Sequence, residues 1–96
     1  MSNYQPSLFY GQNDTQCFLC GSRQYINRHE IFFGSAYRKK SQRYGLWVNV
    51  CMSCHDKIHF GKDHSLDEHL KKQGQKRFEE FFSREKFMEE FGKNRL

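Results

Sequence analysis

The chain lacks the features that would mark a membrane protein or an exported one. No run of about 18 apolar residues occurs in its 96 residues, which excludes an ordinary transmembrane helix. Residues 1–11 also lack the basic segment followed by an apolar segment that is typical of a secretory signal. We therefore expect a cytoplasmic protein with no membrane partner, in which cysteines stay reduced or bind a metal.

Proline and aliphatic side chains are scarce as well. The chain has one Pro, six Leu, three Ile and two Val, alongside ten Phe, five Tyr and one Trp. A chain of this length usually forms one domain, and so lean a core commonly needs a metal or a disulfide to hold it together. The sequence thus predicts one small domain with an aromatic core and a cross-link.

Acidic side chains are too few to balance the basic ones. Sixteen Lys and Arg stand against eleven Asp and Glu, which gives a net charge of +5. Residues 1–61 hold seven basic and three acidic side chains, whereas residues 62–96 hold nine and eight. This surplus favours a polyanionic partner, either nucleic acid or an anionic membrane surface, but it suits a merely solvated surface equally well.

The four cysteines form two C-x-x-C pairs, Cys17 with Cys20 and Cys51 with Cys54. Each pair can hold one side of a tetrahedral Zn²⁺, and Gly21 suits the turn of a zinc knuckle. No cysteine is left over. A disulfide is disfavoured by the lack of an export signal, and a redox motif lacks its βαβ context, while an iron–sulfur cluster stays open.

The segment that carries the cysteines predicts two strands and a helix. Residues 24–33 and 46–50 are rich in β-branched and aromatic side chains, which favours strands. Between them, residues 36–44 form a basic connector with one or two helical turns. A helix begins near residue 55 and is stopped by Gly61. This order is typical of a treble-clef or ββα-metal unit built around zinc.

The C-terminal third predicts two helices. Ser65 and Glu68 read as a capping box for a helix that runs to about residue 82. Ser83 caps a shorter helix that Gly92 ends. Their apolar sides would consist of Leu66, Leu70, Phe78, Phe81 and Phe82, and of Phe87, Met88 and Phe91. We interpret this stripe as core packed on the zinc unit.

These elements together predict an α+β fold with its C-terminal helices packed on a zinc core. Residues 1–14 read as a flexible arm, and residues 15–96 as a single domain. Within the domain, residues 15–61 make the ββα-metal core and residues 62–96 the helical extension.

Three histidines are placed so that they can meet. His55 and His59 are four residues apart, so they share one face of a helix. His29 lies on the first predicted strand and could oppose that face. Three imidazoles would then be available to a second metal, distinct from the zinc.

The motifs Cys-x-x-Cys, His-Glu-Ile-Phe and Cys-x-x-Cys-His-x-x-x-His follow one another along the chain. This order resembles the HNH endonucleases, in particular small phage-type members with two zinc knuckles. Residues 29–34, 37–41 and 44–48 resemble the core of these enzymes, and residues 87–94 resemble their tail. The resemblance covers roughly residues 15–96.

The resemblance implies a metal-dependent enzyme that hydrolyses DNA phosphodiester bonds. By position in the motif, His29, His55 and His59 would be ligands of the catalytic divalent ion, Mg²⁺ or Mn²⁺. That ion would stabilise charge on the phosphate while a general base activates water. A phage-encoded protein of this kind would work in the host cytoplasm.

Glu30 departs from the family pattern, which generally has histidine as the general base here. A carboxyl group with an ordinary pKa near 4.3 is ionised at pH 7, but it is about two units less basic than imidazole. Its oxygens also suit Mg²⁺ or Mn²⁺. Three interpretations stay open: Glu30 as base, Glu30 as metal ligand, or a DNA-binding fold that no longer cuts.

Four basic residues of the connector, Arg38, Lys39, Lys40 and Arg43, are candidates for contacts to DNA phosphates. The simpler alternative is an exposed cationic loop without a partner. Two other functions stay open: an inactive zinc module that binds nucleic acid or assists replication or recombination, and a protein-interaction adaptor. A homodimer through the C-terminal helices is also left open.

Overall fold

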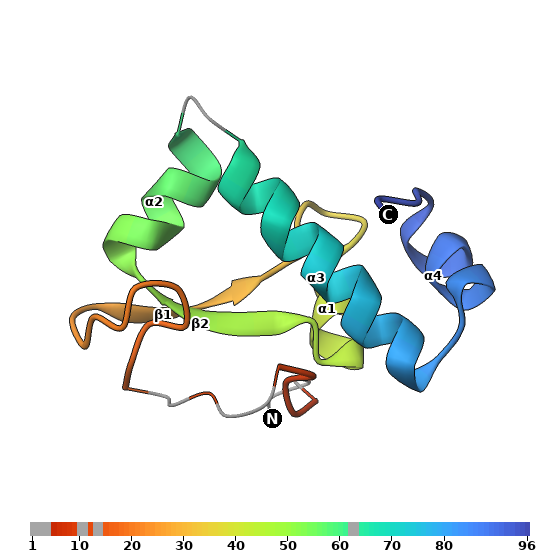
Figure 1. Ribbon diagram of the computed structural model, residues 1–96, viewed down its shortest axis with the longest axis horizontal. Coiled ribbons are helices and arrows are strands. Elements are labelled where there is room, and N and C mark those ends of the chain that lie inside the picture. Colours follow the sequence, from red (N-terminus) through yellow and green to blue (C-terminus); the bar gives the residue numbers. More distant parts are fainter. Residues whose placement is uncertain (1–4, 10–11, 13–14, 62–63) are drawn as a thin grey trace.

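Figure 1 shows the computed structural model, which describes residues 5–9, 12, 15–61 and 64–96. These residues form a small α+β fold, as expected, with one two-stranded sheet and four helices. In chain order the elements are β1 Ile26–Glu30, α1 Arg38–Tyr44, β2 Trp47–Cys51, α2 Met52–Phe60, α3 Ser65–Phe81 and α4 Arg84–Phe91. Within the described ranges, no helix has both the length and the apolar character needed to cross a bilayer.

The sheet pairs β1 and β2 antiparallel, with His29 opposite Val48 and Glu30 opposite Trp47. Because successive side chains of a strand point to opposite faces, His29 and Glu30 face different sides of the sheet. All five residues of β2 are buried. In Figure 1, α2 and α3 lie on one side of the strands and the N-terminal segment lies on the other. The sheet is therefore covered on both faces.

β1 is shorter than the strand expected over residues 24–33. Tyr25, just before it, has a positive φ of 53°. After β1 the amide of Ile31 still donates to the Leu46 carbonyl at 3.0 Å. The amide of Phe32 then donates to Ser41 Oγ at 3.1 Å and the Ser41 hydroxyl donates to the Phe32 carbonyl at 2.7 Å, so the pairing ends there. Ile31 and Phe32 are both buried in the core.

α2 begins at Met52, three residues before the expected start. Cys51 is both the last residue of β2 and the N-cap of α2. The second C-x-x-C pair therefore straddles the strand-to-helix junction, with Cys54 in the first helical turn. Gly61 ends the helix, as expected.

The capping box expected at the start of α3 is wrong. His64 is the N-cap, Ser65 lies inside the helix, and no side chain caps this end. With the cap one residue earlier, Asp67 takes the position that Glu68 was expected to hold. The carboxylate of Asp67 is bound by Lys71 at 2.9 Å and does not reach back to the cap.

The boundaries of α4 are confirmed. Ser83 Oγ accepts a hydrogen bond from the Lys86 amide at 3.0 Å, which satisfies one of the free amides of the first turn. Gly92 ends the helix in the left-handed conformation with φ 73°.

Aromatic rings fill the core between the sheet and the C-terminal helices. Phe78 and Phe87 are fully buried with ring centroids 5.5 Å apart, and Phe32 lies 5.4 Å from Phe87. A Cβ at Gly74 would come within 3.2 Å of the Phe32 ring. Gly74 therefore lets α3 approach the core closely, although it lowers the helix propensity.

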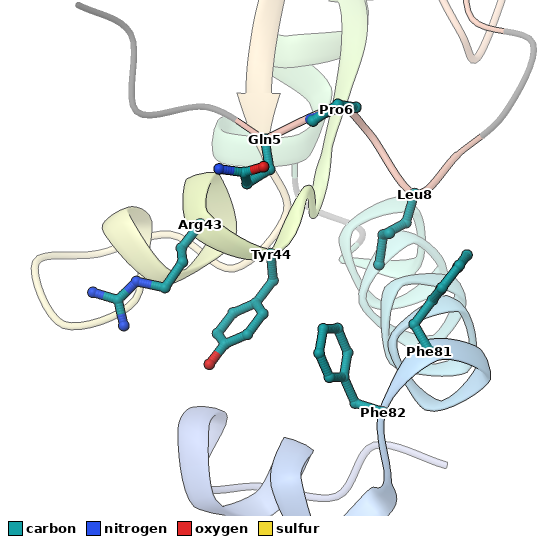
Figure 2. A pocket seen from close by; sticks show the side chains of 7 residues that line it. All are labelled: Gln5, Pro6, Leu8, Arg43, Tyr44, Phe81 and Phe82. Atoms are coloured by element: carbon teal, nitrogen blue, oxygen red, sulfur yellow. The ribbon is translucent and has the colours of Figure 1, made fainter.

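Three residues expected in the core are half-exposed: Phe81, Phe82 and Met88. α3 ends at Phe81, so the two phenylalanines lie where the chain turns toward α4 and only one side of each can be covered. Phe81 and Phe82 form part of an apolar hollow of about 360 Å³ (Figure 2). The hollow is lined by Gln5, Pro6, Leu8, Arg43, Tyr44, Phe81 and Phe82.

We expected residues 1–14 to form a flexible arm, but the described part of this segment packs on β2. The indole Nε1 of Trp47 donates to the Gln5 carbonyl at 2.7 Å, and Ser7 Oγ donates to the Trp47 carbonyl at 2.7 Å. Phe9 is buried in the core. The other residues of this arm lie outside the part of the chain that the structure describes.

The docking of this segment can be tested at Gly45, which ends α1 with φ 72°. A Cβ there would clash with the Pro6 carbonyl oxygen, whereas a Cβ at Gly92, with φ 73°, would find the Tyr37 hydroxyl at 3.5 Å. Both alanine variants incur the left-handed strain of about 1–2 kcal/mol. We expect Gly45→Ala to lower the free energy of unfolding by a further 1–3 kcal/mol or so, because of the overpacking. Urea denaturation measures the difference, and equal losses would contradict the docking.

Candidate metal centres

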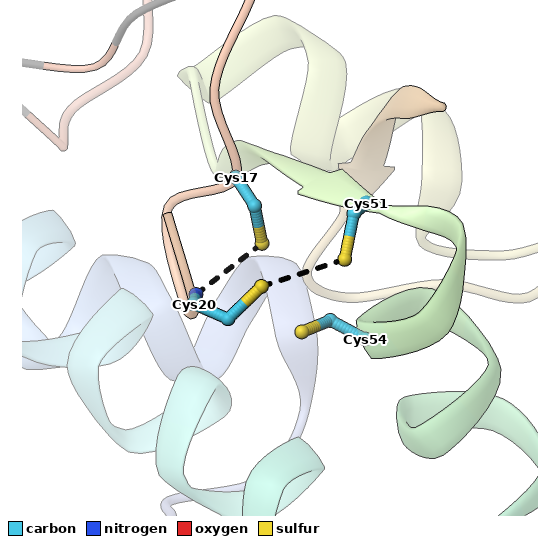
Figure 3. A group of neighbouring side chains, drawn as sticks. All are labelled: Cys17, Cys20, Cys51 and Cys54. Atoms are coloured by element: carbon cyan, nitrogen blue, oxygen red, sulfur yellow. Dashed lines mark hydrogen bonds between the residues drawn. The ribbon is translucent and has the colours of Figure 1, made fainter. Parts of the chain in front are cut away.

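Four cysteines meet where the loop before β1 approaches the junction of β2 and α2 (Figure 3). Cys17 and Cys20 come from the loop, Cys51 from the end of β2 and Cys54 from the first turn of α2. Their sulfurs lie within 4.8 Å of one another, and Cys20 Sγ is 3.6 Å from Cys51 Sγ. Sulfurs on a tetrahedral zinc, with bonds of about 2.3 Å, lie roughly 3.7 Å apart. The cluster can therefore hold a metal ion such as zinc.

The backbone shapes the first cysteine pair for this role. Cys17 Sγ accepts hydrogen bonds from the amides of Leu19 and Cys20, each at 3.4 Å. Gly21, with φ 81°, donates its amide to the Cys17 carbonyl at 3.0 Å and closes the turn. The amide of Phe18, in the same loop, donates to the Asn49 carbonyl at 2.7 Å. This last bond ties the loop to β2, so Asn49 acts here through its backbone as a strand residue.

The sulfur cluster is reduced, and its members differ in acidity. All four cysteines are free. Burial raises the pKa of Cys17, but hydrogen bonds from nearby backbone amides outweigh it and lower the pKa to about 6. Burial, together with the neighbouring thiols, raises the pKa of Cys54. Cys17 is thus the more acidic of these two thiols, and a metal that takes up all four sulfurs must displace protons from the site.

Three histidines form a second cluster between β1 and α2. The ring centroid of His29 lies 5.3 Å from those of both His55 and His59, which are 4.5 Å from each other. Their ligand nitrogens lie within 4.8 Å of one another, and the Nε2 atoms of His55 and His59 are 3.1 Å apart. The register of the sheet and the helical spacing together bring the imidazoles to one place.

The chemistry of the histidine cluster suits a divalent cation. His29 is 1% exposed, and its Nε2 has no hydrogen-bond partner. Burial, followed by the charges of His55 and His59, lowers the pKa of His29 to about 4. Burial and His55 also lower the pKa of His59. Both rings are therefore neutral at pH 7, which is the form of imidazole that binds a metal. The unpartnered buried nitrogen is the kind of atom that a cation would satisfy.

Glu30 lies on the other face of β1 from the histidine cluster. Its Oε1 accepts a hydrogen bond from Nε2 of Gln42 on α1 at 3.1 Å. Its charge raises the pKa of His29, against the larger opposing effects of burial and the other two imidazoles. The group of atoms close enough to share a metal contains no Glu30 oxygen. The geometry therefore does not support Glu30 as a direct ligand.

Two of the four basic candidates on α1, Arg38 and Lys39, line a hollow of about 350 Å³. Its lining consists of Gly34, Ser35, Arg38 and Lys39. The charge of Arg38 reaches the cluster, because it contributes to the lowered pKa of His59 after burial and His55.

The other two basic candidates have different surroundings. Lys40 Nζ donates to the Glu90 carbonyl at 2.8 Å and lies 3.6 Å from the Glu90 carboxylate, so it ties α1 to α4. Arg43 lines the apolar hollow of Figure 2. The four residues therefore have different surroundings.

The motifs of the sequence did not reveal an ion pair near the histidines. Lys71 Nζ lies 2.9 Å from Asp67 Oδ2, and Asp67 is buried. Their four-residue spacing is visible in the sequence, but such pairs usually lie on a solvated helix face. Nothing in the spacing indicates burial or a place beside His29 and His59.

Comparison with family models, with curated proteins and with solved structures finds no match for this chain. The resemblance to HNH endonucleases therefore depends on the sequence motifs alone.

Removal of the metal tests the cysteine cluster. A structural zinc stabilises small domains by about 10–16 kcal/mol, which is as large as their whole stability of about 5–15 kcal/mol. We expect Cys54→Ser to lose the bound zinc and its helical circular dichroism, and a strong chelator to do the same to the native protein. Ser53→Ala, one residue away on the exposed side, is the control and should keep both. A Cys54→Ser protein that stays folded and retains its zinc would contradict the assignment.

Proposed function

We propose that this protein is a metal-dependent endonuclease of the HNH type that hydrolyses DNA phosphodiester bonds. In this proposal the cysteines hold a structural zinc in a treble-clef, ββα-metal core, and the histidines hold a second divalent ion, Mg²⁺ or Mn²⁺. The observation that carries it is the convergence of His29, His55 and His59, whose nitrogens lie within 4.8 Å of one another.

The arrangement of the three imidazoles suits this chemistry. A divalent ion bound there would stabilise negative charge on the scissile phosphate and on the leaving oxygen. His29 is held rigidly by burial, while His55 and His59 are partly exposed. The cluster therefore has one closed side and one side that a phosphate can approach.

Arg38 and Lys39 supply the neighbouring positive charge that a DNA backbone needs. They line the hollow that begins at Gly34, where a Cβ would find no atom within 4 Å. Lysine and arginine contacts to phosphates position nucleic acid without reading its sequence. We assign these two residues, and not Lys40 or Arg43, to the path of the DNA backbone.

Glu30 is our candidate for the general base. Its side chain is half-buried at the end of β1, and its charge raises the pKa of His29. A carboxylate is a weaker base than the histidine that HNH enzymes usually have there, so we expect slow cleavage.

Cleavage is tested by incubating zinc-loaded protein with supercoiled plasmid and Mg²⁺, Mn²⁺ or Ni²⁺. We expect nicked circles, and a loss of at least about 100-fold in His29→Ala, because removal of a ligand removes the catalytic ion. His59→Ala is a second variant, should the buried His29 prove necessary for folding. His69→Ala, which changes an exposed histidine of α3, should cut normally. No nicking with any of the three metals, or full activity in His29→Ala, would refute the proposed endonuclease activity.

The same assay separates the roles of Glu30. A general base predicts loss of nicking in Glu30→Gln, and equal or faster nicking in Glu30→His. Full activity in Glu30→Gln would assign the base elsewhere.

A second candidate function is a catalytically inactive zinc module that binds nucleic acid. The observation that favours it is the hydrogen bond from Gln42 to Glu30, on the side of β1 away from the imidazoles. In this case the protein would bind DNA with every metal and cut with none.

Both functions predict that DNA lies along Arg38. We expect Arg38→Ala to weaken binding to a short duplex by about 3- to 10-fold and to lower the slope of log K against log salt by about one. Arg43→Ala, on the same helix but beside the apolar hollow, should change the affinity less than twofold. Fluorescence anisotropy at several salt concentrations measures both. Equal losses would contradict the assigned path, and no binding at low salt would favour a protein-interaction adaptor.

A further inference from the structure

The ion pair of Asp67 and Lys71 on α3 is enclosed to a degree that is unusual for a helix pair. The two side chains are 11% and 13% exposed, and the oxygen and nitrogen are 2.9 Å apart. Asp67 Oδ2 accepts from Lys71, but Asp67 Oδ1 has no hydrogen-bond partner. Among the described residues, Asp67 is the one acidic residue that is buried.

Burial of this pair needs a reason other than stability. Removing two charges from water often costs more than their attraction returns, and a carboxylate oxygen without a partner adds to the cost. Apolar side chains in such a place are often as stable or more stable, so the buried carboxylate indicates a role for its charge.

The neighbouring group is the histidine cluster, with one aromatic ring between it and the pair. Lys71 Nζ lies over the Phe33 ring at 4.6 Å, and that ring lies 4.7 Å from the ring of His59 and 5.8 Å from that of His29. The charge of Asp67 acts on both histidines, and it opposes the effects of burial and of the other imidazoles on their pKa values.

Two more charged groups act on the cluster from other elements. Arg38 on α1 acts on His59 with the same sign as Lys71, and Glu30 acts on His29 from the opposite face of β1. Glu30 is held by Gln42 on that far face. Asp67 is therefore the buried carboxylate that acts on the cluster from the side of α3.

We infer that Asp67 is a positioning residue for a divalent cation held by His29, His55 and His59. Lys71 neutralises part of the charge of the Asp67 carboxylate and so limits its attraction for the cation. This inference rests on the histidine metal site of the proposed function. Imidazole ligands offset none of a metal's charge, so a dication held there would add two positive charges to a half-buried place on which Arg38 already acts. A fixed carboxylate nearby offsets part of that charge.

The test is a calorimetric titration of Ni²⁺ or Mn²⁺ into zinc-loaded protein, with the cysteine site already filled. We expect Asp67→Asn to weaken binding of the second ion severalfold, because it removes the attraction of a buried carboxylate for the dication. Lys71→Gln should strengthen it severalfold, because it frees the charge of Asp67 from its partner. Glu68→Gln changes the neighbouring carboxylate, which pairs with Arg95 at the surface, and should leave the affinity unchanged.

Opposite shifts in the two variants are a result that a merely structural ion pair would not produce. If Asp67→Asn and Lys71→Gln both lower the melting temperature while their affinity for the second ion equals that of the native protein, the inference is overturned and the proposed metal site stands. If the native protein binds no second ion, the metal site fails and the role of Asp67 fails with it. Should Asp67→Asn not fold, the double variant with Lys71→Gln removes both charges, and it should bind the second ion severalfold more weakly than Lys71→Gln alone.

Discussion

The convergence of four sulfur atoms is the constraint on which the rest of the structure depends. Cys51 ends β2 and Cys54 lies one helical turn later, so the cluster clamps the angle at which α2 leaves the sheet. That angle decides where His55 and His59 lie, and the strand register brings His29 to them. In a domain with so few aliphatic side chains, a metal held by these sulfurs would supply order that the core cannot supply alone.

β1 divides the candidate chemistry between two sides of a very small sheet. His29 faces α2 and α3, and its neighbour Glu30 faces α1, because side chains alternate along a strand. On the face of His29, the Phe33 ring lies against His59 and Lys71 lies over that ring. The two faces therefore carry different side chains, although the residues that define them are adjacent in sequence.

The predictions from sequence succeeded where the determinants are local. Ser83 and Gly92 mark the two ends of α4 as predicted, because a cap hydroxyl and a left-handed glycine act within one helical turn. The capping box at Ser65 failed because the helix begins one residue earlier, with His64 as its N-cap. The strand expected over residues 24–33 ended early, because the amide and carbonyl of Phe32 are bound by the Ser41 side chain and not by the neighbouring strand.

The sequence by itself determined the two C-x-x-C pairs, the one-turn spacing of His55 and His59 and the surplus of basic residues, because each is a matter of composition or of neighbours along the chain. Only the tertiary structure decided that the charge of Arg38 acts on His59 while Arg43 lines an apolar hollow, and that Asp67 is buried. The reason is physical: burial and electrostatic environment are set by which distant segments pack together, and spacing along the chain carries no record of them.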